Sequence, residues 1–188
     1  MTAEATHTAP HVDKSSVSIE IRSYQPEDLD QVRKMFITGM SKYAEVEGQS
    51  EEFWADYVKE SLETDLSDIQ GTYFESGGHY WVATTIVDKS EVIVGMVGLE
   101  GKPNQEGELR RMSVKPEYRR FGVGRILVSH LEKWSRANNV CKIWLTAADA
   151  AQQACRFYES LGFSFVQSKP YPAENPYFQV LEYEKRLD

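Results

Sequence analysis

The sequence predicts an α/β (α+β) domain with helices flanking a central sheet, and three observations support this. Segments with the period-two pattern of strands alternate along the chain with segments of helical spacing. Hydrophobic residues make up 41% and aromatic residues 12% of the chain, which is typical of a globular protein. A length of 188 residues supports one sizeable core but not two comfortable ones. We therefore expect one domain over 17–188, preceded by a disordered tail over 1–16 that is rich in Thr, Ala and Ser.

The first half of the chain predicts one strand, two helices and a hairpin. Residues 17–22 alternate between apolar and polar types and indicate a half-buried strand. A helix begins at Pro26, because proline suits the first helical turn and the acidic residues after it suit the positive end of the helix dipole. Residues 51–65 predict a second helix that carries several aromatic residues. A short turn joins the strands expected over 80–87 and 91–99.

The second half continues with alternating strands and helices. A strand over 108–114 leads through a glycine-containing loop into a helix over about 123–138. The remaining elements are a strand at 141–147, a helix at 151–161, a short strand at 163–167 and a closing strand at 179–185. The whole order is β-α-α-β-β-β-α-β-α-β-β, with no internal repeat.

The loop that precedes the third long helix predicts a phosphate-binding site. Gly122 and Gly124 let the backbone turn tightly and approach a ligand closely. The start of the helix adds unpaired N–H groups and the positive end of the helix dipole. Arg119, Arg120 and Arg125 add positive charge around the same loop. These features together favour a phosphate or a pyrophosphate.

The loop matches neither of two common phosphate-binding motifs. A P-loop requires Lys-Ser or Lys-Thr after its last glycine, and neither dipeptide follows here. A dinucleotide fingerprint requires a third glycine in the first strand–helix–strand unit of the chain. On the glycines alone, two alternatives stay open: an α/β protein that binds a different phosphate, and an ordinary loop that starts a helix.

Two segments give the loop a more specific context. Residues 108–127 read ELRRMSVKPEYRRFGVGRIL, and residues 156–163 read RFYESLGF. In this order they resemble the R/Q-x-x-G-x-G/A loop, with its preceding Val-x-Pro-x-Tyr, and the F-Y-E-x-L-G-F signature of the GCN5-related N-acetyltransferase (GNAT) family. The resemblance implies a GNAT-type mixed, mostly antiparallel sheet with a splayed cofactor cleft. Arg120 stands where many members have Gly, and Ala151 where many have Asn.

The resemblance also implies an activity, namely acetyl transfer from acetyl-CoA to a primary amine by direct attack in a ternary complex, without a metal. The acceptor would be a small amine, an amino-acid derivative or a peptide N-terminus. A non-catalytic acyl-CoA-binding or regulatory module of the same fold is the alternative. The residues implied to hold acetyl-CoA are Met112, Ser113, Val114, Arg119, Arg120, Phe121, Gly122, Val123, Gly124 and Arg125.

By the same resemblance, Tyr158 is the acid that protonates the departing thiolate, and Glu108 is the base that accepts the amine proton, directly or through a water. Glu100 is the competing base. The acceptor is expected between the first two helices and the 168–178 loop, with Tyr43, Phe53 and Tyr177 as substrate-binding residues. Trp144 is expected to be a core residue.

Charge and cysteine usage narrow the class of partner. A net charge of −8 argues against a nucleic-acid partner. No window approaches the ~20 apolar residues of a membrane span. Cys141 and Cys155 lack the C-x-x-C spacing, and the four histidines are too scattered to form a metal site. We expect a cytoplasmic enzyme without a metal, a nucleic-acid partner or a membrane partner, and both a monomer and a homodimer stay open.

Overall fold

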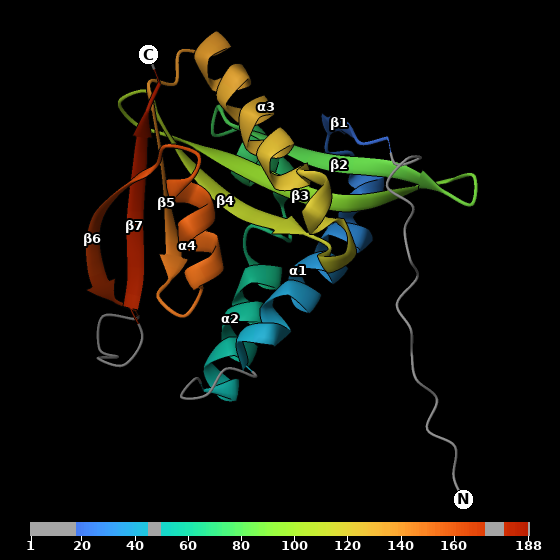
Figure 1. The fold of residues 1–188 in the computed structure, drawn as a ribbon, viewed down its shortest axis with the longest axis horizontal. Coiled ribbons are helices and arrows are strands. Elements are labelled where there is room, and N and C mark those ends of the chain that lie inside the picture. Colours follow the sequence, from blue (N-terminus) through green and yellow to red (C-terminus); the bar gives the residue numbers. More distant parts are fainter. Residues whose placement is uncertain (1–17, 45–49, 172–178, 188) are drawn as a thin grey trace, which may run out of the picture.

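The computed structural model describes residues 18–44, 50–171 and 179–187 (Figure 1). Strands and helices alternate much as the sequence predicts, which confirms the α/β fold class. The elements in chain order are β1 (Glu20–Ser23), η1 (Pro26–Asp28), α1 (Leu29–Ala44), α2 (Glu51–Glu63), η2 (Gln70–Phe74), β2 (His79–Val87), β3 (Ser90–Lys102), β4 (Glu106–Val114), η3 (Pro116–Phe121), α3 (Val123–Ala137), β5 (Lys142–Ala148), α4 (Gln152–Glu159), β6 (Ser164–Pro170) and β7 (Gln179–Arg186).

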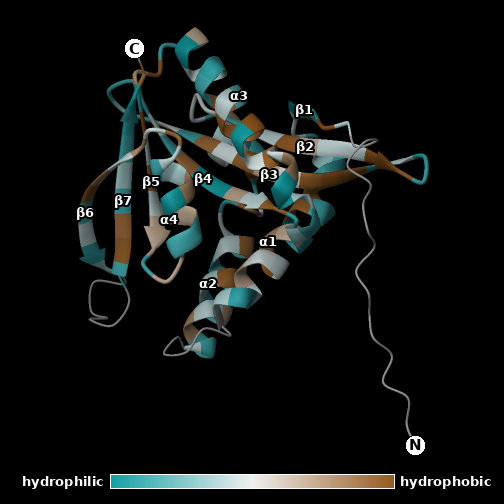
Figure 2. Ribbon diagram, viewed as in Figure 1, coloured by the Kyte–Doolittle hydropathy of each residue, from teal (hydrophilic) through white to brown (hydrophobic). Residues whose placement is uncertain are grey.

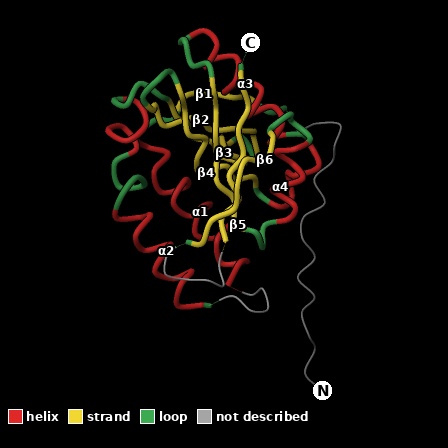
Figure 3. The backbone as a smooth tube through the Cα atoms, turned by 90° about the vertical axis from the view of Figure 1, so that its left-hand side faces the viewer, coloured by secondary structure: helices red, strands yellow, loops and turns green. Residues whose placement is uncertain are grey.

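The strands form one seven-stranded sheet in the order β1-β2-β3-β4-β5-β7-β6. Every neighbouring pair is antiparallel except β4 and β5, which run parallel. Helices lie on both sides of the strands in the view of Figure 3. This arrangement confirms the mixed, mostly antiparallel sheet that the family resemblance implies.

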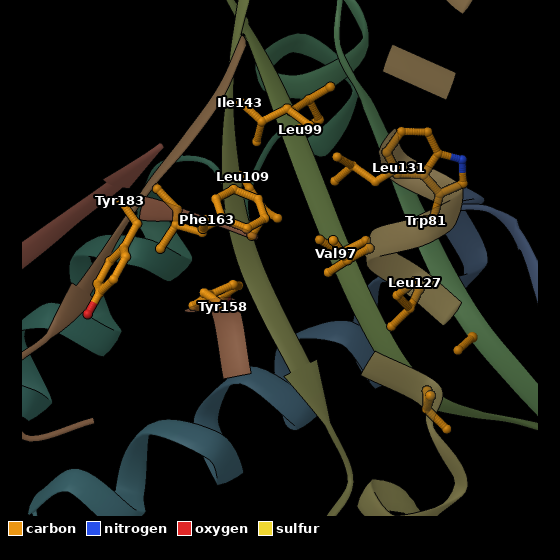
Figure 4. Close-up of a cluster of buried hydrophobic side chains, with 14 of the residues drawn as sticks. Trp81, Val97, Leu99, Leu109, Leu127, Leu131, Ile143, Tyr158, Phe163 and Tyr183 are labelled. Atoms are coloured by element: carbon orange, nitrogen blue, oxygen red, sulfur yellow. The ribbon is translucent and has the colours of Figure 1, made fainter. Parts of the chain in front are cut away.

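The sheet separates two buried clusters of apolar side chains. One cluster joins β2 and β3 to α3, β5 and α4, and includes Trp81, Leu99 and Leu127 (Figure 4). The other joins the opposite face of β2 and β3 to α1 and η2, and includes Phe36 and Tyr73. Because both faces of the central strands are covered, those strands are apolar over long stretches, drawn in brown in Figure 2.

A partly buried ion pair joins η1, which leads into α1, to the edge strand β1. Arg22 donates from Nη1 and Nη2 to the two carboxylate oxygens of Asp28 at 2.7 and 2.8 Å. The backbone N–H of Gln25 donates to the same carboxylate at 2.8 Å. Burial alone would raise the pKa of Asp28, but the hydrogen bonds from Arg22 and Gln25 outweigh it and hold that pKa below its ordinary value.

The parallel strands β4 and β5 are joined only at their beginning. Their register pairs are Glu106 with Lys142, Gly107 with Ile143 and Glu108 with Trp144. Beyond these pairs β4 continues to Val114 and β5 to Ala148, and the two ribbons separate (Figure 1). Within the described residues, no backbone pairing joins β4 to β5 beyond these positions, so the sheet opens into a cleft.

The structure departs from the expected elements in several places. A π-helical turn, η2, follows α2 and was not predicted. The expected strand over 17–22 is observed as Glu20–Ser23, and Val17 lies outside the described residues. β6 extends to Pro170 because its pairing with β7 continues to that residue. The tail over 1–16 also lies outside the described residues.

Candidate functional site

The glycine loop has the conformation of an anion-binding helix start. Gly122 lies directly before α3 with a φ of 74°, a conformation that costs other residues roughly 1–2 kcal/mol. No atom lies within 4 Å of the position that a Cβ would take there, so backbone conformation alone requires glycine. The N–H of Ile126 donates to Gly122 O at 3.0 Å as the first bond of the helix. The N–H groups from Val123 to Arg125 therefore have no helical acceptor and can face a ligand.

The second glycine of the loop brings three elements together. A Cβ on Gly124 would lie 3.1 Å from Met112 Cε and 3.1 Å from Phe157 Cζ. A Cβ at these distances would require Met112 or Phe157 to shift by a few tenths of an ångström, so glycine suits the close packing of α3 against β4 and α4. The phosphate loop, the open strand and the helix that carries Tyr158 therefore meet at one point.

Arginine side chains surround the loop, as the sequence predicts. Arg119 donates from Nε to the carbonyl of Val114 at 3.3 Å, and Arg125 donates to Ser160 Oγ at 3.4 Å. Arg119, Arg120 and Arg125 are all exposed, so their charges can reach a bound anion. The half-buried ring of Phe121 packs on Tyr118 at a centroid distance of 5.9 Å.

The open edge of β4 presents the backbone of Met112 and Val114 to the cleft. The N–H of Lys115 donates to Val94 O at 2.9 Å, so Lys115 faces β3. Backbone groups alternate in direction along a strand, and those of Val114 and Met112 therefore point away from β3. The contact between Arg119 and the Val114 carbonyl agrees with this direction.

A β-bulge precedes these two residues. The register moves from Gly98 opposite Arg110 to Met96 opposite Ser113, so two residues of β4 oppose one residue of β3. The extra residue is Arg111, whose φ is 55°. Because of the bulge, consecutive arginines 110 and 111 both project to the side of α2, whereas Leu109 and Met112 pack on the side of α3.

A cavity of about 490 Å³ lies between the cleft and the first two helices. It contains six of the residues that the sequence predicts for the site: Tyr43, Phe53, Glu108, Met112, Ser113 and Tyr158. Other residues of its wall include Met40, Trp54, Tyr57, Glu60, Arg110, Arg111, Trp144, Lys169 and Tyr171. The predicted substrate residue Tyr177 lies outside the described residues.

Tyr158 combines burial with an available hydroxyl group. The residue is 7% exposed, and its ring packs on Phe157 and Phe163. Figure 4 shows Tyr158 and Phe163 in the buried cluster. No hydrogen bond joins its hydroxyl to another residue within the described part of the chain. Burial, with smaller contributions from Tyr43 and Cys155, raises the pKa of Tyr158 above its ordinary value. The hydroxyl is therefore protonated at neutral pH and can donate a proton into the cavity.

Glu108 lies in a cluster of four charged side chains. It stands directly opposite Glu100 across β3 and β4, where two like charges would repel each other. Lys102 lies 2.9 Å from Glu108 Oε2 and 2.5 Å from Glu100 Oε1, and Arg110 donates to Glu100 at 2.6 Å. Burial would raise the pKa of Glu100, but the hydrogen bonds from Lys102 and Arg110 outweigh it and lower that pKa. Glu108 lines the cavity, whereas Glu100 does not.

Aromatic rings form the wall opposite the cleft. Tyr43 stacks on Trp54 at a centroid distance of 5.1 Å, and Phe53 contacts the edge of the same ring at 5.4 Å. Trp144 is half-buried and lines the cavity, so its expected place in the core is wrong. It occupies the last paired position of β5 before the strands separate, and the open cleft leaves its side chain uncovered. Lys102 Nζ lies 5.9 Å from its ring centroid.

Sequence reasoning missed a buried ion pair under the cavity. Arg111 donates from Nε to Asp65 Oδ2 at 2.8 Å and from Nη2 to Asp65 Oδ1, and the two side chains are 5% and 4% exposed. Burial would raise the pKa of Asp65, but the hydrogen bonds and charge of Arg111 outweigh it and lower that pKa. In a regular strand, one of the two consecutive residues Arg110 and Arg111 would point into the apolar core. An arginine pair at this place in a strand was therefore a sequence signal that could have predicted the bulge.

Over residues 18–44, 50–171 and 179–187, no group of three or more His, Cys, Asp or Glu side chains is placed to hold a metal ion. In the same part of the chain, no helix has the length and apolar character to cross a membrane.

A family model and curated relatives match this chain. The model described as the acetyltransferase (GNAT) family matches residues 46–163. An N-acetylaspartate synthetase of Xenopus tropicalis is 32% identical over 136 residues, which cover 70% of this chain and 46% of that protein. N-acetyltransferase 8 of Homo sapiens is 32% identical over 118 residues, covering 58% of this chain and 49% of that protein. The chain thus spans about half the length of the curated relatives that it matches.

Solved structures share the fold. A GNAT-family acetyltransferase of Staphylococcus aureus Mu50 has a TM-score of 0.72 and 22% identity, covering 91% of this chain and 100% of that one. The PaiA N-acetyltransferase of Thermoplasma acidophilum, solved with coenzyme A, has a TM-score of 0.68 and 21% identity, covering 89% of this chain and 99% of that one. At these identities the likeness concerns the fold alone.

Proposed function

The chain belongs to the acetyltransferase (GNAT) family, and from that premise we propose that it transfers an acetyl group from acetyl-CoA to a primary amine. The observation that carries the proposal is that the open edge of β4 and the two candidate catalytic side chains border the same cavity. The open edge of β4, next to the phosphate loop, forms part of the wall of a cavity that also contains Tyr158 and Glu108. We propose residues 17–188 as the single catalytic domain.

The residues of the cleft fit the cosubstrate. The unpaired N–H groups at the start of α3 and the arginines around Gly122 suit its pyrophosphate. The backbone of Met112 and Val114 suits the amide-containing arm, which can pair with an open strand edge. When bound, acetyl-CoA would supply an acetyl thioester, whose carbonyl a backbone N–H of β4 could polarise.

The proposed roles of Glu108 and Tyr158 keep the proton balance. The attacking amine must be neutral, so Glu108 accepts a proton from the ammonium form, directly or through a water. The neutral amine then attacks the thioester carbonyl and the C–N bond forms. The nitrogen, now positively charged, loses its second proton to solvent, the C–S bond breaks, and Tyr158 gives its proton to the leaving sulfur and regains one from solvent. The position of Glu108 in the cavity wall favours it over Glu100 as the base. The transfer needs no metal.

The cavity wall favours a compact amine with polar and apolar parts. Glu60 and Glu108 supply negative charge, Arg110 and Lys169 supply positive charge, and Tyr43 and Trp54 supply apolar surface. An amino acid or its derivative carries both signs of charge, and it suits this wall better than a uniformly charged acceptor does. The relative named N-acetylaspartate synthetase supports amino acids as the first acceptors to test.

The first experiment measures ligand selectivity. The melting temperature of the full chain is compared with acetyl-CoA, CoA, ATP and NAD, because a ligand at 100 times its Kd stabilises the native state by about 2.7 kcal/mol. We expect a rise with acetyl-CoA and CoA alone. A rise only with ATP or NAD would overturn the proposal in favour of a different phosphate ligand.

The second experiment distinguishes an enzyme from a binding module. Amino acids, their derivatives, small amines and short peptides are incubated with acetyl-CoA, and the acetylated product is identified by mass spectrometry. A free-thiol readout needs a Cys141→Ser background, because Cys141 is exposed and would react with the reagent. CoA binding without turnover on any acceptor class would favour the non-catalytic acyl-CoA-binding module.

A further inference from the structure

We propose that Asp65 is a positioning residue for the transfer reaction, which it serves by holding the bulge of β4 through Arg111. The proposal rests on the function proposed above, because the bulge sets which backbone groups of β4 face the cosubstrate. Asp65 follows α2 on the acceptor side of the sheet, whereas the groups that it controls lie in the cofactor cleft.

The ion pair is surrounded by further contacts. Tyr73 of η2 donates its hydroxyl hydrogen to Asp65 Oδ2 at 2.5 Å. Arg111 Nη1 donates to the hydroxyl of Tyr57 on α2 at 3.2 Å. The guanidinium carbon of Arg111 lies 4.7 Å from the ring centroid of Phe36 on α1. The Arg111 side chain is therefore held by α1, by α2 and by Asp65, which follows α2 in the chain.

The bulge reverses the direction of the backbone groups that follow it. Before the bulge, Gln105 O accepts from Cys141 N at 2.8 Å, so Gln105 faces β5, and alternation gives Gly107 and Leu109 the same direction. After the bulge, Met112 and Val114 face the cleft. A strand without the extra residue would turn Met112 and Val114 toward β3 instead.

The bulge requires support because Arg111 is not glycine. A φ of 55° is unfavourable for a residue with a side chain, and it persists only where the surroundings determine it. The fork of hydrogen bonds to Asp65 supplies such a constraint, since it fixes the direction of the Arg111 side chain. Loss of Asp65 would leave a buried, unpaired guanidinium at a strained position.

The test compares Asp65→Asn with Asp28→Asn in the full chain. Asp28 is a matched control, because it also receives two hydrogen bonds from one arginine, and its side chain is 6% exposed. It lies in η1, and its partner Arg22 is in β1, an outer strand of the sheet away from β4. Calorimetric titration with CoA gives the Kd of each variant. Hydrogen exchange of the peptide over 109–114 measures how well the backbone amides around the bulge are protected.

We expect Asp65→Asn to raise the CoA Kd about tenfold or more, because displaced binding groups lose most of their contribution. Exchange over 109–114 should accelerate in the same variant. Asp28→Asn should lower the melting temperature yet keep the CoA Kd within about twofold and the exchange over 109–114 unchanged.

Several results would overturn the proposal. One is an Asp65→Asn variant that folds and binds CoA with the wild-type Kd. Another is an equal loss of CoA affinity in Asp65→Asn and Asp28→Asn, which would indicate general destabilisation. If Asp65→Asn does not fold, Arg111→Lys decides, because it keeps the charge but loses the fork. A wild-type CoA Kd in Arg111→Lys would refute the proposal that the Asp65–Arg111 ion pair holds the bulge. The hydrogen-exchange measurement needs no ligand, so it tests whether Asp65 holds the bulge even if the wild-type chain does not bind CoA. Failure of the wild-type chain to bind CoA would refute the proposed function instead.

Discussion

Replacement of Tyr158 by Phe separates the proposed acid from a packing residue. The change removes one hydroxyl group and leaves the ring contacts with Phe157 and Phe163 in place. No hydrogen bond to another described residue is lost, so the free energy of unfolding should change by less than about 1 kcal/mol. A general acid typically contributes 10²- to 10⁴-fold, or about 2.7–5.4 kcal/mol of barrier. We expect kcat to fall within that range while the Kd for CoA stays within about twofold.

The assay is single-turnover acetylation of the acceptor found for the wild-type chain, followed by mass spectrometry of the product. Tyr183→Phe is a matched control, because Tyr183 is also buried but donates its hydroxyl hydrogen to Glu159 at 3.0 Å and does not line the cavity. This control should lose about 1 kcal/mol of stability and keep kcat. A Tyr158→Phe variant with unchanged kcat, or an equal loss in both variants, would refute the assignment of the acid.

Three further predictions concern the base, the loop and acid stability. Glu108→Gln should lower kcat about 10²-fold with CoA affinity retained, and an unchanged kcat would assign the proton to another acceptor. Gly122→Ala should destabilise the chain by roughly 1 kcal/mol and weaken CoA binding, measured by denaturant unfolding and calorimetry; because no atom would clash with the new Cβ, an unchanged stability would contradict the conformational argument. Asp65 and Asp28 have lowered pKa values in the folded state. The stability that they contribute is therefore complete above the unfolded value of about 3.9 and is lost as pH falls below it. The melting temperature should fall as the pH drops below about 3.9, less steeply in Asp65→Asn, and equal slopes in the two proteins would count against this account.

Features set by local chemistry could be predicted from the sequence. The glycine loop is one, because the left-handed conformation of Gly122 and the close approach of Gly124 are demands that few other residues meet. The start of the first helix at Pro26 is another. Tyr158 and Glu108 entered through the family resemblance, and the structure places both in one cavity, while their roles stay predictions.

Features set by distant partners could not be predicted. The bulge at Arg111 depends on a carboxylate 46 positions earlier in the chain, and nothing local to β4 names that partner. Trp144 has the pattern of a buried strand residue, but it lies at the third and last position where β5 pairs with β4, and the two strands diverge directly after it. The period-two pattern describes a regular strand and carries no information about where two strands separate.

The short junction between β4 and β5 has a consequence for handling the protein. Most sheets have unpaired edges only at their two outer strands, but this one also has an unpaired edge in its interior. An unpaired strand edge is a template for another extended chain and thus a starting point for aggregation. A ligand that pairs with β4 would cover that template. We therefore expect the ligand-free protein to aggregate sooner on storage or warming than the CoA-bound protein, even well below its melting temperature.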